Sequence, residues 1–144
     1  MYLCNFGRNN HFSNSLSIYS PDDIWSISHI FNSNLMVNVN TFTLPLVTES
    51  GTQYVMMVEN LTMFRKFAEK FTEGNLDSYY DLYENFYKIK KTNTNEGNER
   101  EFLKYLNRIF GGSGLKLFRG NSTFTEWMPL KLDQNNTVLT ESCL

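Results

Sequence analysis

The stretch FTLPLVTESGTQYVMMV, residues 42–58, predicts a β-hairpin. Phe42, Leu44 and Leu46 recur at every second position, which is the period of a strand with one buried face. Residues 49–52, Glu-Ser-Gly-Thr, have the composition of a turn, and residues 54–58 form the returning strand. Pro45 has no N–H to donate to a ladder, so its strand is expected at an edge of the sheet or interrupted there.

Upstream of the hairpin, residues 35–39 show the same alternation in the opposite phase. Leu35, Val37 and Val39 are apolar there, whereas the apolar positions after residue 41 are the even ones. Because successive side chains of a strand point to opposite faces, this change of phase predicts a bulge or bend near Asn40–Thr41.

The N-terminal part is predicted to contain two short strands and one helix. Residues 2–6 and 15–19 are expected as strands around the polar loop 7–10. Ser20 has the side chain of a helix cap, Pro21 suits the first helical position, and two Asp residues follow in the first turn. This helix should end near residues 32–34.

Three helices are predicted downstream of the hairpin, over residues 61–73, 76–91 and 99–110. Asn60 and Asn98 are the expected caps of the first and third, with Glu101 placed to complete a capping box. Glycines follow both of these helices. A second hairpin is predicted over residues 115–132, and residues 133–144 are expected as a polar C-terminal tail.

Together these elements predict an α+β fold in which antiparallel β-hairpins pack with about four helices. The length of 144 residues fits a single domain, expected over residues 1–132. Hydrophobic residues make up 41% of the chain and aromatic residues 15%, a content that excludes intrinsic disorder. A chain of this length can bury a core without disulfides or a structural metal.

Composition indicates a cytoplasmic protein that does not insert into a membrane. Cys4 and Cys143 are the two cysteines, and we interpret them as free thiols. No signal peptide is apparent in the first residues, and no apolar run approaches the ~20 residues of a membrane helix. The net charge of −2 gives no overall attraction to nucleic acid. The 18 Asn residues are typical of AT-rich genes, such as those of phages and plasmids.

No catalytic, metal-binding or cofactor-binding motif is present in the sequence. His11 and His29 stand in no known spacing to a Ser or Cys nucleophile. Zinc sites need paired Cys or His ligands at close spacing, which the isolated cysteines and histidines do not provide. Residues 111–116 lack the Gly-Lys-Ser/Thr ending of a phosphate loop. We therefore expect a protein that is not an enzyme and holds no metal and no cofactor.

The predicted helix over residues 76–91 has an unusual composition. On a helical wheel its apolar half has an aliphatic edge at Leu82 and Ile89 and a tyrosine-rich edge on the other side. Tyrosine is common at protein interfaces because it combines a large area with a polar tip. Tyrosines at the rim of a core are the commoner case, and this alternative remains open. The predicted partner-binding residues are Asp77, Tyr80, Tyr83, Glu84 and Tyr87.

From these features we interpret the chain as a small non-enzymatic protein-binding accessory domain. An inhibitor or immunity-type factor of a phage or mobile element, which covers the surface of a partner protein, fits best. One alternative is a structural subunit of a larger assembly. The other is a nucleic-acid-associated protein that uses the basic residues between 88 and 108, although Glu96, Glu99 and Glu101 dilute that patch.

Overall fold

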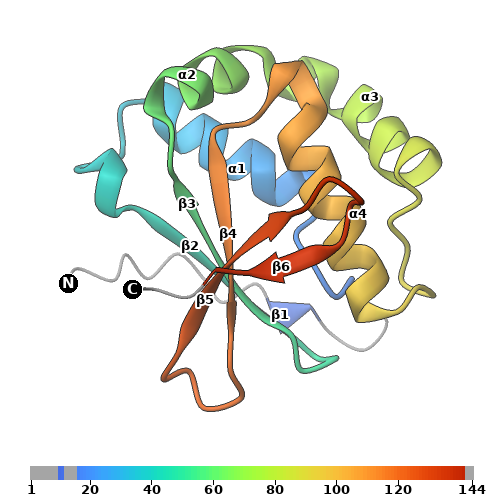
Figure 1. The fold of residues 1–144 in the computed structure, drawn as a ribbon. Helices are drawn as coiled ribbons and strands as arrows, with labels where there is room; N and C mark the ends of the chain where they lie inside the picture. Colours follow the sequence, from blue (N-terminus) through green and yellow to red (C-terminus); the bar gives the residue numbers. More distant parts are fainter. Residues whose placement is uncertain (1–9, 12–15, 142–144) are drawn as a thin grey trace.

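The β-hairpin predicted from residues 42–58 forms the first half of a twisted sheet (Figure 1). The computed structural model describes residues 10–11 and 16–141. Strands β2 (Thr43–Thr48) and β3 (Gln53–Val58) pair antiparallel across the predicted turn. Leu46 and Thr48 of β2 are buried while Val47 is exposed, as the alternation of the sequence predicts.

The sheet has six strands within the described residues, and their order follows the chain. The other strands are β1 (Asn10–His11), β4 (Leu115–Gly120), β5 (Trp127–Leu132) and β6 (Val138–Thr140). All neighbouring strands from β2 to β6 pair antiparallel, whereas the two residues of β1 pair parallel with the end of β2. Pro45 pairs with Val55 on one side, and β1 reaches only Val47 and Thr48 on the other, so Pro45 occupies an edge position.

Four α-helices gather on one side of the sheet (Figure 1). They are α1 (Pro21–Asn32), α2 (Leu61–Lys70), α3 (Leu76–Asp81) and α4 (Asn95–Arg108). A π-helical turn, η3 (Leu82–Phe86), continues α3, and 3-10 turns η1 (Val39–Thr41), η2 (Glu73–Asn75) and η4 (Ile109–Gly111) connect other elements. The architecture is therefore α+β, as the sequence predicts.

Two of the helix starts occur where the sequence places them. The Ser20 hydroxyl accepts from the Asp23 backbone N–H at 3.4 Å, and the Asp23 carboxylate accepts from the Ser20 N–H at 2.7 Å. This reciprocal capping box fixes the first turn of α1. The side chain of Asn60 caps α2 by accepting from the Met63 N–H at 3.0 Å. Helix α2 ends at Lys70, three residues before the predicted end.

The core lies between the sheet and the helices. Every second residue of the central strands is buried against helical side chains. Aromatic rings supply much of its volume, and the largest fully buried side chains include Tyr19, Tyr54, Tyr83, Tyr105, Phe64, Phe67, Phe71 and Phe102. These rings bury the greatest apolar area in the chain and therefore contribute most to the hydrophobic stabilisation.

The strand predicted over residues 35–39 is absent, and the chain there ends α1 instead. The backbone N–H groups of Ser33, Asn34 and Leu35 donate to carbonyls of the last turn of α1. Asn34 has φ +56°, the left-handed conformation that closes a helix. Since these amides cap the helix, they cannot join a ladder, and the side chain of Val37 is fully exposed. The predicted bend at Asn40–Thr41 is present as η1.

The strand predicted over residues 15–19 is also wrong where it can be compared, at residues 16–19. This segment is held by side-chain bonds rather than by a ladder. The Tyr19 hydroxyl donates to the Leu44 carbonyl, and the Thr52 hydroxyl donates to the Ser17 carbonyl at 2.6 Å. The predicted strand 2–6 lies outside the described residues, and β1 includes Asn10 of the predicted polar loop.

Helix α4 begins at Asn95, which is four residues before the predicted start at residue 99. Its cap is Thr94, whose hydroxyl accepts from the Gly97 N–H at 3.1 Å. Asn98, the predicted cap, is instead buried, and its amide donates to the Lys90 carbonyl at 2.9 Å and to the Ser17 hydroxyl at 3.1 Å. Asn98 therefore ties α4 to two other segments of the chain.

The connection from α4 to β4 passes very close to the start of α2. Gly114 has φ +71°, and its carbonyl accepts from the N–H groups of Glu59 and Asn60 at 2.9 and 3.0 Å. A Cβ at this position would come within 2.5 Å of the Asn60 carbonyl oxygen. Only glycine fits there without displacing the backbone.

Residues 133–141 of the expected polar tail fold onto the sheet. The Asp133 carboxylate accepts from the Asn135 and Thr137 N–H groups, both at 2.8 Å, and closes a turn. Strand β6 then pairs with β5, with Leu130 opposite Thr140. Glu141 joins this hairpin to its neighbours through ion pairs with Lys131 and Lys116, both at 3.0 Å.

Candidate interaction surface

Three tyrosines of the predicted binding helix point into the core. Tyr79, Tyr83 and Tyr87 have exposed fractions of 4%, 1% and 8%. The Tyr83 hydroxyl donates to the Tyr19 carbonyl at 2.6 Å, and the Tyr79 hydroxyl donates to the Lys70 carbonyl. Burial raises the pKa of Tyr83 well above its ordinary value, so this hydroxyl stays protonated as a donor. Two of the predicted partner-binding residues, Tyr83 and Tyr87, are thus core residues.

The π-helical turn explains which side chains of this helix become exposed. The Tyr87 N–H donates to the Leu82 carbonyl at 2.9 Å, five residues back rather than four. In a regular α-helix Phe86 would lie on the same side as Tyr83, three residues away. In the wider π-helical turn each residue rotates about the helix axis by a smaller angle. Tyr87 therefore stays on the buried side of the helix with Tyr83, and Phe86 points outward.

The remaining predicted residues lie on the exposed half of the helix. Asp77 and Glu84 are exposed, and Tyr80 is half-buried. The Tyr80 hydroxyl donates to the carboxylate of Asp22 on α1, and the pKa of Tyr80 is raised by burial and by this hydrogen bond. Tyr80 therefore links α3 to α1, while the two carboxylates are open to solvent.

Sequence periodicity misses two exposed apolar residues, because it assigns both to the buried half. The exposed fraction is 39% for Leu82 and 68% for Phe86. No signal in the sequence marks the π-helical turn that exposes them. We call the exposed apolar and acidic residues of α3 and η3 together the acid–aromatic face, which consists of Asp77, Asp81, Leu82, Glu84 and Phe86.

The carboxylates of the acid–aromatic face are not paired with cations in the described part of the chain. Within residues 10–11 and 16–141, neither Asp77, Asp81 nor Glu84 forms an ion pair with Lys or Arg. Asp81 accepts only from the side-chain amide of Asn85, at 2.6 Å. This face therefore combines uncompensated negative charge with an exposed aromatic ring.

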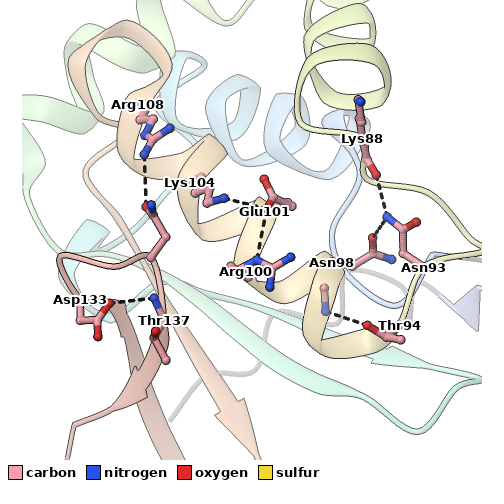
Figure 2. Close-up of polar contacts among 12 residues, drawn as sticks. Lys88, Asn93, Thr94, Asn98, Arg100, Glu101, Lys104, Arg108, Asp133 and Thr137 are labelled. Atoms are coloured by element: carbon pink, nitrogen blue, oxygen red, sulfur yellow. Dashed lines mark hydrogen bonds and ion pairs between the residues drawn. The ribbon is translucent and has the colours of Figure 1, made fainter.

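Three of the basic residues between 88 and 108 have polar partners within the protein. Figure 2 shows that Arg100 and Lys104 both donate to the carboxylate of Glu101, at 3.2 and 2.8 Å. Arg108 donates to the side-chain oxygen of Asn136 at 3.2 Å (Figure 2). Lys88, Lys90 and Lys91 are exposed, and their side chains have no partner within the described residues.

A second candidate site is a groove between α4 and the turn that precedes β6. It has a volume of about 520 Å³ and includes Glu99, Arg100, Lys104 and Arg119 among its lining residues. Glu99 is 3% exposed and accepts from Arg119 at 3.0 Å and from the Tyr54 hydroxyl at 2.8 Å. Burial and the negative charge of Glu99 raise the pKa of Tyr54, which keeps that hydroxyl protonated. The buried carboxylate therefore has two donors.

Catalytic and metal-binding arrangements were sought among the same side chains. His29 is exposed on α1, and its ring stacks on Trp25 with a centroid distance of 5.0 Å. Cys4 and Cys143 lie outside the described residues. In the part of the chain that the structure describes, no three His, Cys, Asp or Glu side chains gather as metal ligands would. None of the helices described has the length and apolar character needed to cross a bilayer.

Comparison of the chain with protein families, with curated proteins and with solved structures finds no match in any of the three. Function therefore has to be inferred from the surfaces themselves. The two that combine charge with exposed binding groups are the acid–aromatic face on α3 and η3 and the groove beside α4.

Proposed function

We propose that this protein is a small non-enzymatic accessory factor that binds another protein and inhibits it by covering a basic surface. The observation that carries the proposal is the exposed ring of Phe86 on a helical segment whose carboxylates, Asp77, Asp81 and Glu84, form no ion pair within the described residues. Large exposed apolar side chains rimmed by charge are typical of protein-interaction sites. A cytoplasmic factor of a phage or mobile element is the setting that the Asn-rich composition favours.

Each part of the acid–aromatic face supplies a different component of binding. Phe86 and Leu82 provide apolar area that a partner pocket can remove from water, and such buried anchors dominate binding energy. Asp77, Asp81 and Glu84 attract Lys and Arg of the partner, which raises the association rate and selects a basic surface. Basic protein surfaces commonly hold nucleic acid, so covering one would block that use.

The proposal is tested by quantitative affinity capture from native extract with matched variants. We expect Phe86→Ala and Glu84→Lys each to reduce capture of the dominant partner at least tenfold. The reason is that the first removes the apolar anchor and the second places a cation against a basic surface. Both positions are exposed, so folding should change by less than about 0.5 kcal/mol.

The controls repeat the same chemical changes elsewhere on the surface. Val37→Ala removes a fully exposed apolar side chain after α1, and Glu49→Lys reverses an exposed charge in the β2–β3 turn. Both should capture the partner normally. Retention of the partner by folded Phe86→Ala and Glu84→Lys would reject the proposal. Salt-sensitive retention on DNA that is weakened by Arg100→Ala would favour the nucleic-acid alternative. Self-association into a defined large species would favour a structural subunit of a larger assembly.

A further inference from the structure

Strand β6 has an open edge whose backbone groups can be identified from the ladder. The Asp133 N–H donates to the Thr137 carbonyl at 3.0 Å, and the Glu141 N–H donates to the Pro129 carbonyl at 2.9 Å. Hydrogen-bonded pairs alternate with non-bonded pairs in an antiparallel ladder, and Leu130 lies opposite Thr140. The N–H and C=O groups of Val138 and Thr140 therefore point away from β5, and no other described strand pairs with β6.

A groove runs along this open edge. The hollow of about 520 Å³ has α4 as one wall and residues 135–138 as the other. A second hollow of about 750 Å³, lined by residues 138–141 with Lys131, shares Arg119 and Val138 with the first. Clefts of 300–1,000 Å³ are the usual size for bound ligands, and a strand added to a sheet lies about 4.8 Å from its neighbour. The two hollows thus leave room beside β6 for a ligand of this size.

Unused donors in the groove favour an acidic ligand. Arg119 is 37% exposed and contacts Glu99 through one nitrogen only, although a guanidinium carries five N–H donors. Arg100 uses its Nε toward Glu101, which leaves its two terminal nitrogens without a described partner. Glu99 is buried and already accepts from two donors. The other carboxylates of the lining are Glu96, which is exposed on α4, and Glu141, which is paired with Lys116 and Lys131. Arginine forks bind carboxylates in a bidentate manner.

We propose that this groove receives an extended acidic segment of a partner protein, which adds to β6 as a further strand. Val138 and Thr140 would supply the backbone hydrogen bonds, and Arg100 and Arg119 would bind a carboxylate of the segment. A single chain fits better than the sheet edge of a second copy, because α4 stands across the groove from residues 135–138. This site uses none of the residues of the acid–aromatic face, so each proposal can fail without the other.

The test is a selection of displayed random 12-residue peptides on the full chain, followed by titration of the strongest selected peptide. We expect selected peptides rich in Asp and Glu, and hydrogen exchange at the Val138 and Thr140 amides should slow when the peptide binds. Thr140→Pro removes an outward N–H without removing a bond to β5, and should weaken binding about tenfold. Thr140→Val, which keeps the N–H, should bind within about twofold of the native chain.

The contribution of the arginines is tested separately, because Thr140→Pro changes only the hydrogen-bonding edge of β6. Arg100→Ala should weaken the same peptide about tenfold, whereas Arg65→Ala, at an exposed position on α2, should leave it unchanged. The proposal is overturned if no peptide is enriched, or if the selected peptides are basic. The proposal also fails if the selected peptides bind Thr140→Pro as tightly as they bind Thr140→Val. A concentration-dependent dimer that protects the same two amides without peptide would show that a second copy is the occupant. The exchange measurement needs no variant and holds if Thr140→Pro folds poorly.

Discussion

Tyr83 and Phe86 are three residues apart on one helix, yet the first is 1% exposed and the second 68%. Their difference shows how a single backbone feature selects the residues that a partner could touch. The i→i+5 bond from Tyr87 to Leu82 widens the helix just where the regular period would bury Phe86. The core keeps its tyrosines, and the apolar side chains left outside become candidates for binding.

At the residue scale we predict different costs for removing two tyrosine hydroxyls. Tyr83→Phe should lower the free energy of unfolding by about 1–3 kcal/mol, because the buried Tyr19 carbonyl loses its donor. Tyr80→Phe should cost less than about 1 kcal/mol, since the carboxylate of Asp22 is exposed and water can replace the hydroxyl. Urea unfolding of both variants measures the difference. Equal losses of unfolding free energy in the two variants would contradict the difference in burial between Tyr83 and Tyr80.

A second prediction at this scale concerns two glycines. Gly114→Ala should destabilise the protein by at least about 2 kcal/mol, since it adds a left-handed non-glycine residue and a clash with the Asn60 carbonyl. Gly74→Ala, where a Cβ meets nothing within 4 Å, should be neutral or slightly stabilising. Thermal unfolding measures both. A Gly114→Ala variant as stable as the native chain would show that the two segments are not in contact.

At the scale of the elements, the β5–β6 hairpin is held by a small ionic cluster that should respond to acid. Glu141 accepts from Lys131 and Lys116, both at 3.0 Å, and these hydrogen bonds hold the pKa of Glu141 below its ordinary value of 4.5. A carboxylate with a lowered pKa stabilises the folded state at pH above its ordinary pKa. That contribution is lost as pH falls through the lowered value.

We therefore predict that the Leu139 amide exchanges faster, relative to its intrinsic rate, between pH 5 and about pH 3. The Met56 amide, in a central strand, should keep its protection over the same range. In Glu141→Gln the Leu139 amide should show weak protection that no longer depends on pH. If the Leu139 amide of the native chain keeps constant protection from hydrogen exchange down to pH 3, Glu141 does not stabilise the β5–β6 hairpin in this way.

Local signals predict the elements well where a short-range contact decides the structure. The Ser20 and Asn60 caps, the turn at residues 49–52 and the hairpin over residues 115–132 depend on neighbours in the sequence, and the structure confirms them. Residues 35–39 and Asn98 were predicted wrongly because other parts of the chain compete for their polar groups, the adjacent end of α1 in the first case and the 88–93 connection in the second. The end of α1 uses the amides after residue 32, and the 88–93 connection binds the Asn98 amide.

The candidate site is less predictable than the fold, for the same reason. Asp77 and Glu84 are exposed as the helical period predicts, but Leu82 and Phe86 depend on the π turn. The groove at β6 depends on Arg119, residues 135–138 and α4, which meet only through the tertiary fold. No spacing in the sequence brings these segments together.

At the scale of the whole molecule, charge is distributed unevenly although the net value is only −2. Carboxylates that form no ion pair with any described residue lie on α3 and η3, and exposed Arg donors line the groove at α4. Opposite potentials on separate surfaces allow the chain to attract a basic partner surface and an acidic segment at the same time.

This separation predicts how binding through the acid–aromatic face depends on salt. Raising NaCl from 50 to 500 mM should slow association with the partner at least fivefold while dissociation changes little, because screening acts mainly on the approach of opposite charges. Surface plasmon resonance measures both rates. Glu84→Gln should reduce the dependence on salt, and Glu49→Gln should not. An association rate that does not vary with salt would argue for a purely apolar contact.

Because the strand order follows the chain from β2 to β6, all but one of these pairings form between neighbours joined by a turn. The exception is β3 with β4, which residues 59–114 separate and which encloses α2, α3 and α4. Folding therefore includes one loop closure with a large entropy cost in this part of the sheet. The folding rate should depend on how early the intervening helices form and shorten that loop. The β2–β3 hairpin and the three-stranded β4–β5–β6 unit can each form early, and the pairing of β3 with β4 then joins them.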